Sequence, residues 1–241
     1  MDLWLIAAAA FLAGAIASIA GFGIGSLLTP LVSVTMGTRL AVALISIPHL
    51  AATFVRFWSL RRDVNRAVLL HFGLLSAAGG LAGALLHSMA SSPKLTLVLA
   101  GLLLFAGLGS LTGFTRRMRF GRRTAWAAGA LSGLLGGLVG NQGGIRSAAL
   151  LGFGLKPEQF VATATAIGLM VDAARMPVYF AASGHEIWAQ PGILASSKAG
   201  VLAGTLFGNR LLRRLPAQVF HRLVGALVFT LGVYMLWKGF S

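Results

Sequence analysis

A short polar stretch, residues 140–146, most constrains what this chain can fold into. It reads Gly-Asn-Gln-Gly-Gly-Ile-Arg and separates an apolar run that ends near Val139 from another that begins at Ser147. A helix that stops here and restarts at Gly144 or Ile145 would point backbone N–H groups and a positive dipole end into the gap, which favours an anion. In lipid, such an interruption is tolerated only where protein buries it or where it lines a wet cavity. The alternative is an ordinary loop at the membrane surface.

A similar stretch occurs earlier in the chain. A gapless shift of 119 positions lays residues 14–31 over residues 133–150 and matches these pairs: Gly14 with Gly133, Gly21 with Gly140, Gly25 with Gly144, and Arg56 with Arg175. We therefore expect two related halves, residues 1–113 and 124–241, joined by a basic cytoplasmic linker at 114–123. Glycine-interrupted apolar segments at corresponding places in two halves point to the binding site of a transporter.

The composition is that of an integral membrane protein. Of the 241 residues, 57% are hydrophobic and 10% are charged, whereas a soluble domain carries about 25% charged residues. We predict an all-α, polytopic transmembrane helical bundle. The first apolar run follows an acidic residue and leads directly into a glycine interruption, so we interpret it as a helix rather than a cleaved signal. The absence of cysteine excludes disulfides, thiolate metal ligands and cysteine nucleophiles.

Two of the predicted apolar segments are too short to cross a bilayer. Residues 24–37 and 145–155 each follow a glycine interruption and fall short of the ~20 residues that a crossing needs, so we interpret them as half-helices or re-entrant arms. The other segments are 3–20, 40–58, 67–87, 95–113, 125–140, 159–182, 190–208 and 219–238. Small residues at helical spacing should let helices pack closely and would also permit a homodimer; they include Gly79, Gly83, Gly200 and Gly204.

Most of the net charge of +15 comes from basic residues that set the orientation of the chain in the membrane. Basic residues beside apolar segments are typical of cytoplasmic loops near anionic lipid, so no nucleic-acid partner is expected. The three clusters are Arg61, Arg62 and Arg66; Arg116, Arg117, Arg119, Arg122 and Arg123; and Arg210, Arg213, Arg214 and Arg222. All three lie inside only if an odd number of crossings separates residues 124 and 182, which inverts the second half relative to the first. An eight-span, four-plus-four arrangement would leave the third cluster outside.

Arg146 is the first candidate ligand, because it follows the second interruption within a few residues. Its guanidinium could close on an anionic substrate beside the N–H groups of the restarting helix; the alternative is a side chain that reaches out to the interface. The predicted substrate-binding set is Gly21, Gly23, Gly25, Asn141, Gln142, Gly143, Gly144, Arg146 and Arg175.

Asp172 and Arg175 lie within one apolar segment, three residues apart and therefore on one helix face. Ionisable residues inside a membrane are functional candidates because their burial costs a few kcal/mol or more. The pair could neutralise itself, or Arg175 could contact substrate while Asp172 accepts a coupled proton. His49 is a second candidate proton carrier, with a packed, hydrogen-bonded histidine as the alternative.

Three further polar positions have more than one interpretation. Arg56 is expected to be a topological anchor near the inner end of its segment rather than a ligand. Lys198 could attract anions or extend outward. Thr163 and Thr165 could face a cavity or bond their own helix backbone.

No enzyme is predicted. The pair His185-Glu186 lacks the second histidine of a zinc-binding helix, and neither a G-x-S-x-G elbow nor a P-loop occurs. Five acidic residues in total argue against ATP-driven pumping and a di-metal site. No metal and no cofactor are expected.

Taken together, these motifs resemble the sulfite exporter TauE/SafE family of membrane transporters. The resemblance covers most of the chain and rests on the following segments: Gly21-Phe-Gly-Ile-Gly25, Gly140-Asn-Gln-Gly-Gly144, Ala162-Thr-Ala-Thr-Ala166, Ser183-Gly184 with Trp188, and Gly200-Val-Leu-Ala-Gly204 with Gly208-Asn-Arg210. It implies a multi-pass protein of the bacterial inner membrane that moves sulfur oxyanions or organosulfonates. We expect alternating access, in which one repeat rocks against the other around a site formed by both glycine interruptions.

The chain departs from that family pattern at the expected site. Asn141-Gln142-Gly143 stands where the family has a Gly-Pro-Gly-like stretch, and Asp172 and Arg175 fall where uncharged or amide residues are expected, so the substrate could differ from sulfite. The alternatives to a secondary transporter are an anion channel and a non-transporting membrane scaffold. Transport direction and the coupling ion stay open.

Overall fold

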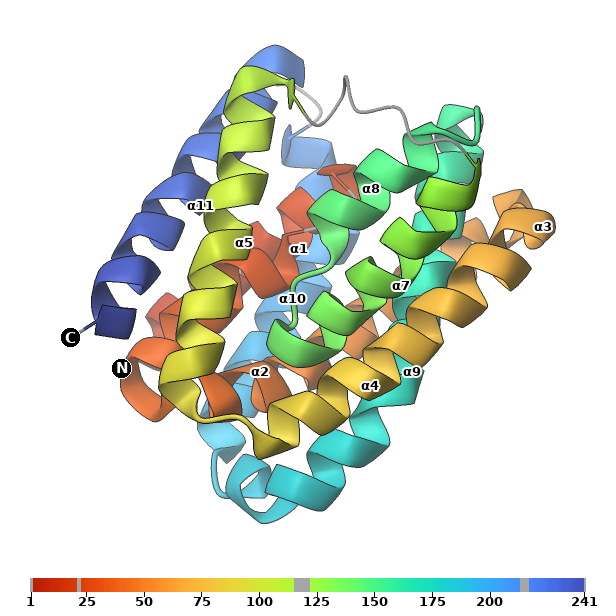
Figure 1. The fold of residues 1–241 in the computed structure, drawn as a ribbon. Coiled ribbons are helices and arrows are strands. Elements are labelled where there is room, and N and C mark those ends of the chain that lie inside the picture. Colours follow the sequence, from red (N-terminus) through yellow and green to blue (C-terminus); the bar gives the residue numbers. More distant parts are fainter. Residues whose placement is uncertain (1, 21–22, 115–121, 213–216, 241) are drawn as a thin grey trace.

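The protein folds as a bundle of helices, as predicted. The computed structural model describes residues 2–20, 23–114, 122–212 and 217–240, and within these ranges every regular element is helical (Figure 1). Five helical stretches of the described chain are long and apolar enough to cross a membrane: Ile24–Asp63, Arg66–Met89, Ser92–Thr112, Pro157–Trp188 and Arg222–Phe240.

The bounds of the elements follow the predicted apolar segments closely. They are α1 (Leu3–Ala20), α2 (Ile24–Leu60), the 3₁₀ turn η1 (Arg61–Asp63), α3 (Arg66–Val68), the π-helical η2 (Leu69–Gly73), α4 (Leu74–Met89), α5 (Ser92–Thr112), α7 (Arg122–Val139), α8 (Gly143–Leu151), α9 (Pro157–Trp188), α10 (Pro191–Leu212) and α11 (Ala217–Phe240). Most of the linker at 114–123 lies outside the described residues.

Helix α2 consists of two arms that meet at Gly37. This glycine has φ 79° and ψ 156° inside an otherwise helical stretch, and a positive φ of this kind favours glycine. Two residues later, the Arg39 N–H donates to the Ser92 hydroxyl oxygen at 3.3 Å. The first arm, residues 24–36, is therefore a half-helix that ends beside the start of α5.

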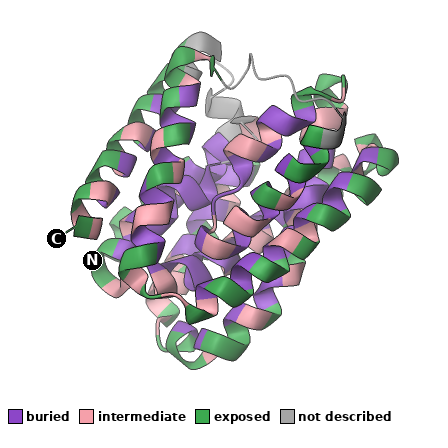
Figure 2. Cartoon of the chain, viewed as in Figure 1, coloured by how far each residue is buried: buried purple, intermediate pink, exposed green. Residues whose placement is uncertain are grey.

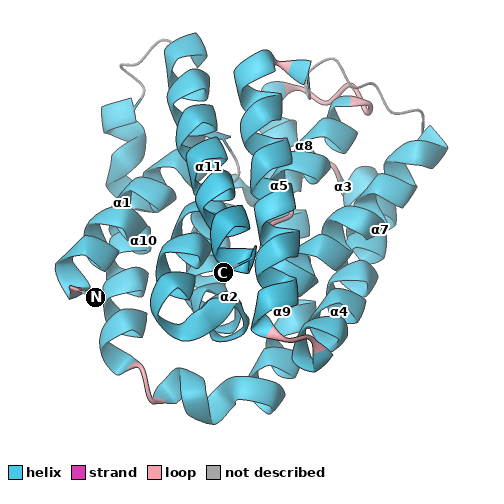
Figure 3. Ribbon diagram, turned by 60° about the vertical axis from the view of Figure 1, so that its left-hand side comes forward, coloured by secondary structure: helices cyan, strands magenta, loops and turns pink. Residues whose placement is uncertain are grey.

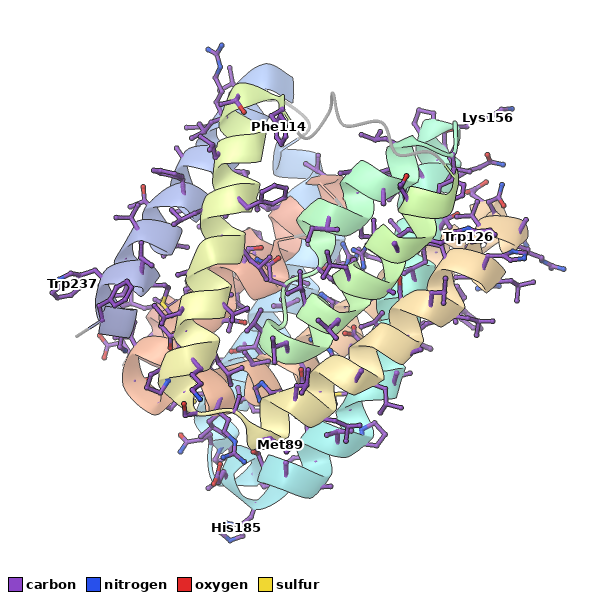
Figure 4. The ribbon with its side chains drawn as sticks, in the orientation of Figure 1. Met89, Phe114, Trp126, Lys156, His185 and Trp237 are labelled. Atoms are coloured by element: carbon purple, nitrogen blue, oxygen red, sulfur yellow. The ribbon has the colours of Figure 1, made fainter. Side chains whose placement is uncertain are left out.

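Two helix hairpins enter the bundle from opposite ends. Figure 4 shows Phe114 and Lys156 at one end of the molecule and Met89 and His185 at the other. Helix α1 starts beside Gly192, at the Met89 end, and the first arm of α2 returns to that end. Helix α7 starts at the Phe114 end, and α8 returns there before Lys156 (Figure 1).

Glycines allow the helices to pack with their backbones in contact, as predicted. A Cβ on Gly83 of α4 would overlap the Leu134 carbonyl of α7, and a Cβ on Gly204 of α10 would overlap the Phe11 carbonyl of α1. The pairs α4–α7 and α1–α10 run side by side, and α5 packs along α11 (Figure 3). The glycine stripes expected to permit a dimer are thus covered within the chain.

Burial is greatest at the centre of the bundle, where the first arm of α2 lies. Ile24, Leu28 and Val32 are each 0% exposed. Many large apolar side chains instead face outward, such as Leu85 on α4 and Leu227 on α11, and the exposed faces form the periphery in Figure 2. An apolar periphery around a buried centre suits a protein surrounded by lipid.

The glycine contacts predict a clear stability effect. We expect Gly204→Ala to lower the free energy of unfolding by about 1–3 kcal/mol, because α1 and α10 must move apart to admit a methyl group. Gly101→Ala is the matched control, since Gly101 is an exposed helical glycine with no heavy atom within 4 Å of its Cβ position. Thermal unfolding in detergent measures both, and equal stability of the two variants would contradict the close packing.

Candidate functional site

The two glycine interruptions meet inside the protein. A Cβ on Gly25 would overlap the carbonyl oxygen of Gly140. Next to this contact, the Ser26 hydroxyl donates to Asn141 Oδ1 at 3.2 Å. The start of α2 and the end of α7 therefore touch, although more than a hundred residues separate them along the chain.

Both interruptions present the amino end of a helix to this meeting point. Gly23, with φ 140°, precedes α2, and its carbonyl accepts the Leu27 N–H at 3.0 Å. Gln142 precedes α8, and its carbonyl accepts the Arg146 N–H at 3.1 Å. The N–H groups in the first turn of each helix have no partner within their own helix, and each amino end carries a positive dipole. Gly21 lies outside the described residues.

Four other members of the predicted set lie in or beside the second interruption. Asn141 and Gln142 are 7% and 5% exposed. Asn141 Nδ2 and Gln142 Oε1 are buried and have no hydrogen-bond partner among the described residues, although buried polar atoms are normally satisfied. Gly143 is buried as the first residue of α8, and Gly144 faces Ala106 of α5. The interruption thus retains one hydrogen-bond donor and one acceptor that no described protein group uses.

Arg146 is buried rather than extended to the surface. It is 4% exposed, and its Nη1 is 3.0 Å from the position a Cβ on Gly168 would occupy, beside the Thr53 methyl group. The absence of a side chain at Gly168 leaves room for this guanidinium. Arg146 therefore carries its charge into the interior between α2 and α9.

Asp172 connects two helices through a pair of contacts. Its Oδ2 is 2.7 Å from His49 Nδ1, and its Oδ1 is 2.7 Å from Arg175 Nη2. Asp172 is 0% exposed and the His49 side chain is 15% exposed. His49 Nδ1 is also 3.4 Å from the Thr53 hydroxyl. The predicted proton-coupling candidates are thus direct neighbours, and Arg175 and Asp172 form an ion pair along α9.

Side chains satisfy the last carbonyls of α7. This helix ends at Val139, so its last carbonyls have few backbone donors; the Gly136 carbonyl accepts the Gly140 N–H at 3.0 Å. The partners are Arg175 Nη1 for Gly136 at 2.6 Å, the Tyr179 hydroxyl for Gly137, and His87 Nδ1 for Leu138 at 2.8 Å. Arg175 belongs to the predicted binding set, and in the structure its Nη1 and Nη2 contact protein groups. Tyr179 and His87 are not in that set, although Tyr179 lies one helical turn after Arg175.

Arg56 has an equivalent task at the other interruption. Its Nη1 donates to the Ala17 carbonyl near the end of α1, and its Nη2 is 3.4 Å from the Thr53 hydroxyl. The side chain therefore turns inward and contacts a helix end. This placement differs from the anchor expected at the end of a span, because the Ala17 carbonyl of α1 lies within reach of the guanidinium.

The remaining candidates lie apart from this cluster or bond the backbone. Thr163 accepts the Asn65 N–H at 2.9 Å, Thr165 is buried, and Lys198 is exposed on α10. No group of three or more metal-ligating side chains occurs among the described residues.

A helical membrane protein in which two helix ends and several arginines meet in the interior has the architecture of a transporter. Residues 6–235 match the family described as "Sulfite exporter TauE/SafE". The chain therefore belongs to the sulfite exporter TauE/SafE family, whose members are membrane transporters rather than enzymes. No curated protein and no solved structure matches the chain.

The caps on α7 predict the effect of removing one hydroxyl. We expect Tyr179→Phe to lower the free energy of unfolding by about 1–3 kcal/mol, because the buried Gly137 carbonyl loses its donor. Tyr234→Phe is the control, since the chain's other tyrosine is 38% exposed on α11. Chemical or thermal unfolding in detergent compares the two, and an unchanged Tyr179→Phe variant would show that the cap contributes nothing.

Proposed function

We propose that this protein is a secondary transporter of small sulfur oxyanions or organosulfonates, with its binding site where the two interruptions meet. The proposed ligands are Arg146, the first N–H groups of α2 and α8, and the amides of Asn141 and Gln142. Arg175 completes the charge around the site while holding α7.

The observation that carries this proposal is the surplus of positive charge in the interior. Arg56, Arg146 and Arg175 all turn into the region around the interruptions. Asp172 is the one buried carboxylate, because the chain's other four acidic residues are exposed: Asp2, Asp63, Glu158 and Glu186. Buried charge inside a bilayer is costly unless it is compensated, and an anionic substrate would compensate it.

The polar groups around the interruptions suit an oxyanion. A sulfite or sulfonate group presents three acceptor oxygens in a small volume. Backbone N–H groups at helix starts, an amide N–H₂ and a guanidinium are all donors to such oxygens. The family match supports this substrate class.

Two observations support inverted halves and alternating access. The hairpins α1–α2 and α7–α8 enter from opposite ends of the bundle (Figure 1). Corresponding helices also have reciprocal partners, because α1 packs on α10 while α7 packs on α4. Rocking of one half against the other would expose the meeting point to each side in turn. With the basic clusters inside, we place the protein in the bacterial inner membrane.

The proposal predicts a loss of transport when the Arg146 charge is removed. In proteoliposomes loaded with sulfite, thiosulfate or a short sulfonate, we expect Arg146→Gln to lower exchange of the labelled anion by about tenfold or more, the equivalent of one charge-assisted hydrogen bond. Lys198→Gln, which removes an exposed charge from α10, should leave exchange unchanged.

Other outcomes point elsewhere. Equal exchange by wild type and Arg146→Gln would remove Arg146 from the site. Flux that rises with concentration without saturation would favour a channel, and no flux of any of these anions would favour a scaffold.

We further propose that His49 and Asp172 couple transport to protons. They share a 2.7 Å contact in the interior, next to Thr53, Arg56 and Arg175, so a proton arriving there would change the charge beside the anion. We expect His49→Gln to keep exchange at equal pH but to lose its stimulation by an imposed pH gradient. His71→Gln, at an exposed histidine, is the control, and retained stimulation in His49→Gln would contradict this role.

A further inference from the structure

Arg56 and Arg175 make the same two contacts in different parts of the chain. Each donates through Nη1 to a backbone carbonyl near the end of an interrupted helix: Ala17 of α1 for Arg56 and Gly136 of α7 for Arg175. Each also directs Nη2 to the residue three positions before it on its own helix: Thr53 for Arg56 and Asp172 for Arg175.

These contacts are equivalent under the shift that relates the two halves. A displacement of 119 positions carries Ala17 to Gly136, Thr53 to Asp172 and Arg56 to Arg175. The correspondence therefore includes the donor atom, the accepting carbonyl and the neighbouring side chain. Chance matching of glycines in an apolar sequence would not reproduce it.

The shared contact has a clear physical purpose. A helix that ends inside a bilayer has a negative dipole end without water, and its last carbonyls have lone pairs that the helix does not use. The Gly136 carbonyl, for example, accepts the Gly140 N–H and still accepts Arg175 Nη1. A guanidinium satisfies both needs because it is positive and has several N–H groups in a fixed planar fork. Each arginine comes from the long helix that follows the interruption in its own half, so it fixes where the interrupted helix ends.

The two contacts differ in the residue that supports the arginine. Thr53 offers a neutral hydroxyl at 3.4 Å, whereas Asp172 offers a carboxylate at 2.7 Å. His49 lies between them, with Nδ1 2.7 Å from Asp172 and 3.4 Å from Thr53. The one buried carboxylate, Asp172, thus lies in the second half. The equivalent position in the first half, Thr53, is within reach of the same histidine.

We propose that Arg56 and Arg175 are a matched pair of positioning residues, each holding the end of the interrupted helix in its own half, and that the supporting carboxylate can be carried by either half. The inference uses the proposed anion transport only for its flux readout. Its structural content stands on the contacts of α1, α2, α7 and α9.

An exchange of the two supporting residues tests the proposal. Thr53→Asp should weaken anion transport by adding a second buried carboxylate, and Asp172→Thr should lower stability and transport by leaving Arg175 without its ion-pair partner. In the double variant Thr53→Asp/Asp172→Thr, the carboxylate lies three residues before Arg56 and four after His49. We expect the flux of the double variant to recover to within about threefold of wild type. If the two substitutions acted independently, their fold reductions in flux would instead multiply.

The thermal midpoint in detergent is measured in the same cycle and does not depend on transport. Recovery of the midpoint in the double variant supports the matched pair even if no tested anion moves, and that absence of flux would count against the proposed function alone. A double variant whose midpoint falls by the sum of the single shifts would overturn the matched pair.

A second comparison separates positioning from substrate binding. Arg56→Lys keeps the charge but loses the planar fork, so we expect a lower maximal rate with the KM for the anion within about twofold of wild type. Arg146→Lys, at the proposed ligand, should instead raise the KM. A KM increase in Arg56→Lys as large as that in Arg146→Lys would make Arg56 a ligand and overturn the inference.

Discussion

The structure depends on how two helices can end inside a bilayer. Helices α1 and α7 end in the interior, since Ala17 and Val139 are buried, so protein groups have to satisfy much of the demand of their final carbonyls. Arginine side chains from α2 and α9 meet these carbonyls, and Tyr179 and His87 add further contacts to α7. Without Tyr179 and His87, the carbonyls of Gly137 and Leu138 would lose their side-chain donors in the interior, which is costly.

The need to stabilise these helix ends also makes the candidate site positive. Guanidiniums brought in to satisfy helix ends add positive charge, and the restarting helices α2 and α8 add their amino ends at the same place. One buried carboxylate, Asp172, offsets only part of this charge. We therefore propose that the groups that stabilise the interruptions also make the interior favourable for an anion, with Arg146 as the added ligand.

Local sequence features predicted much of this architecture. Glycine clusters marked where helices stop, and charged residues in apolar segments marked Arg146, Asp172 and Arg175 as interior groups, because both signals depend on near neighbours. The contact of Gly25 with Gly140 and the reach of Arg56 to Ala17 depend on tertiary packing. A basic residue near a cytoplasmic cluster looks like an anchor in sequence, and only the position of α1 reveals its actual partner.

The central claim is that the two interruptions meet, and proximity across them can be measured directly because the chain has no cysteine. Ser26→Cys and Asn141→Cys would be combined with a protease site inserted between Phe114 and Arg122, and the halves would be treated with Hg²⁺ in membranes and then cleaved. We predict that they stay joined, as they should with Ser33→Cys and Met235→Cys, a contact pair on α2 and α11 in which Ser33 Oγ is 3.5 Å from Met235 Sδ. Separation of the halves for the first pair, with cross-linking of the second, would contradict it.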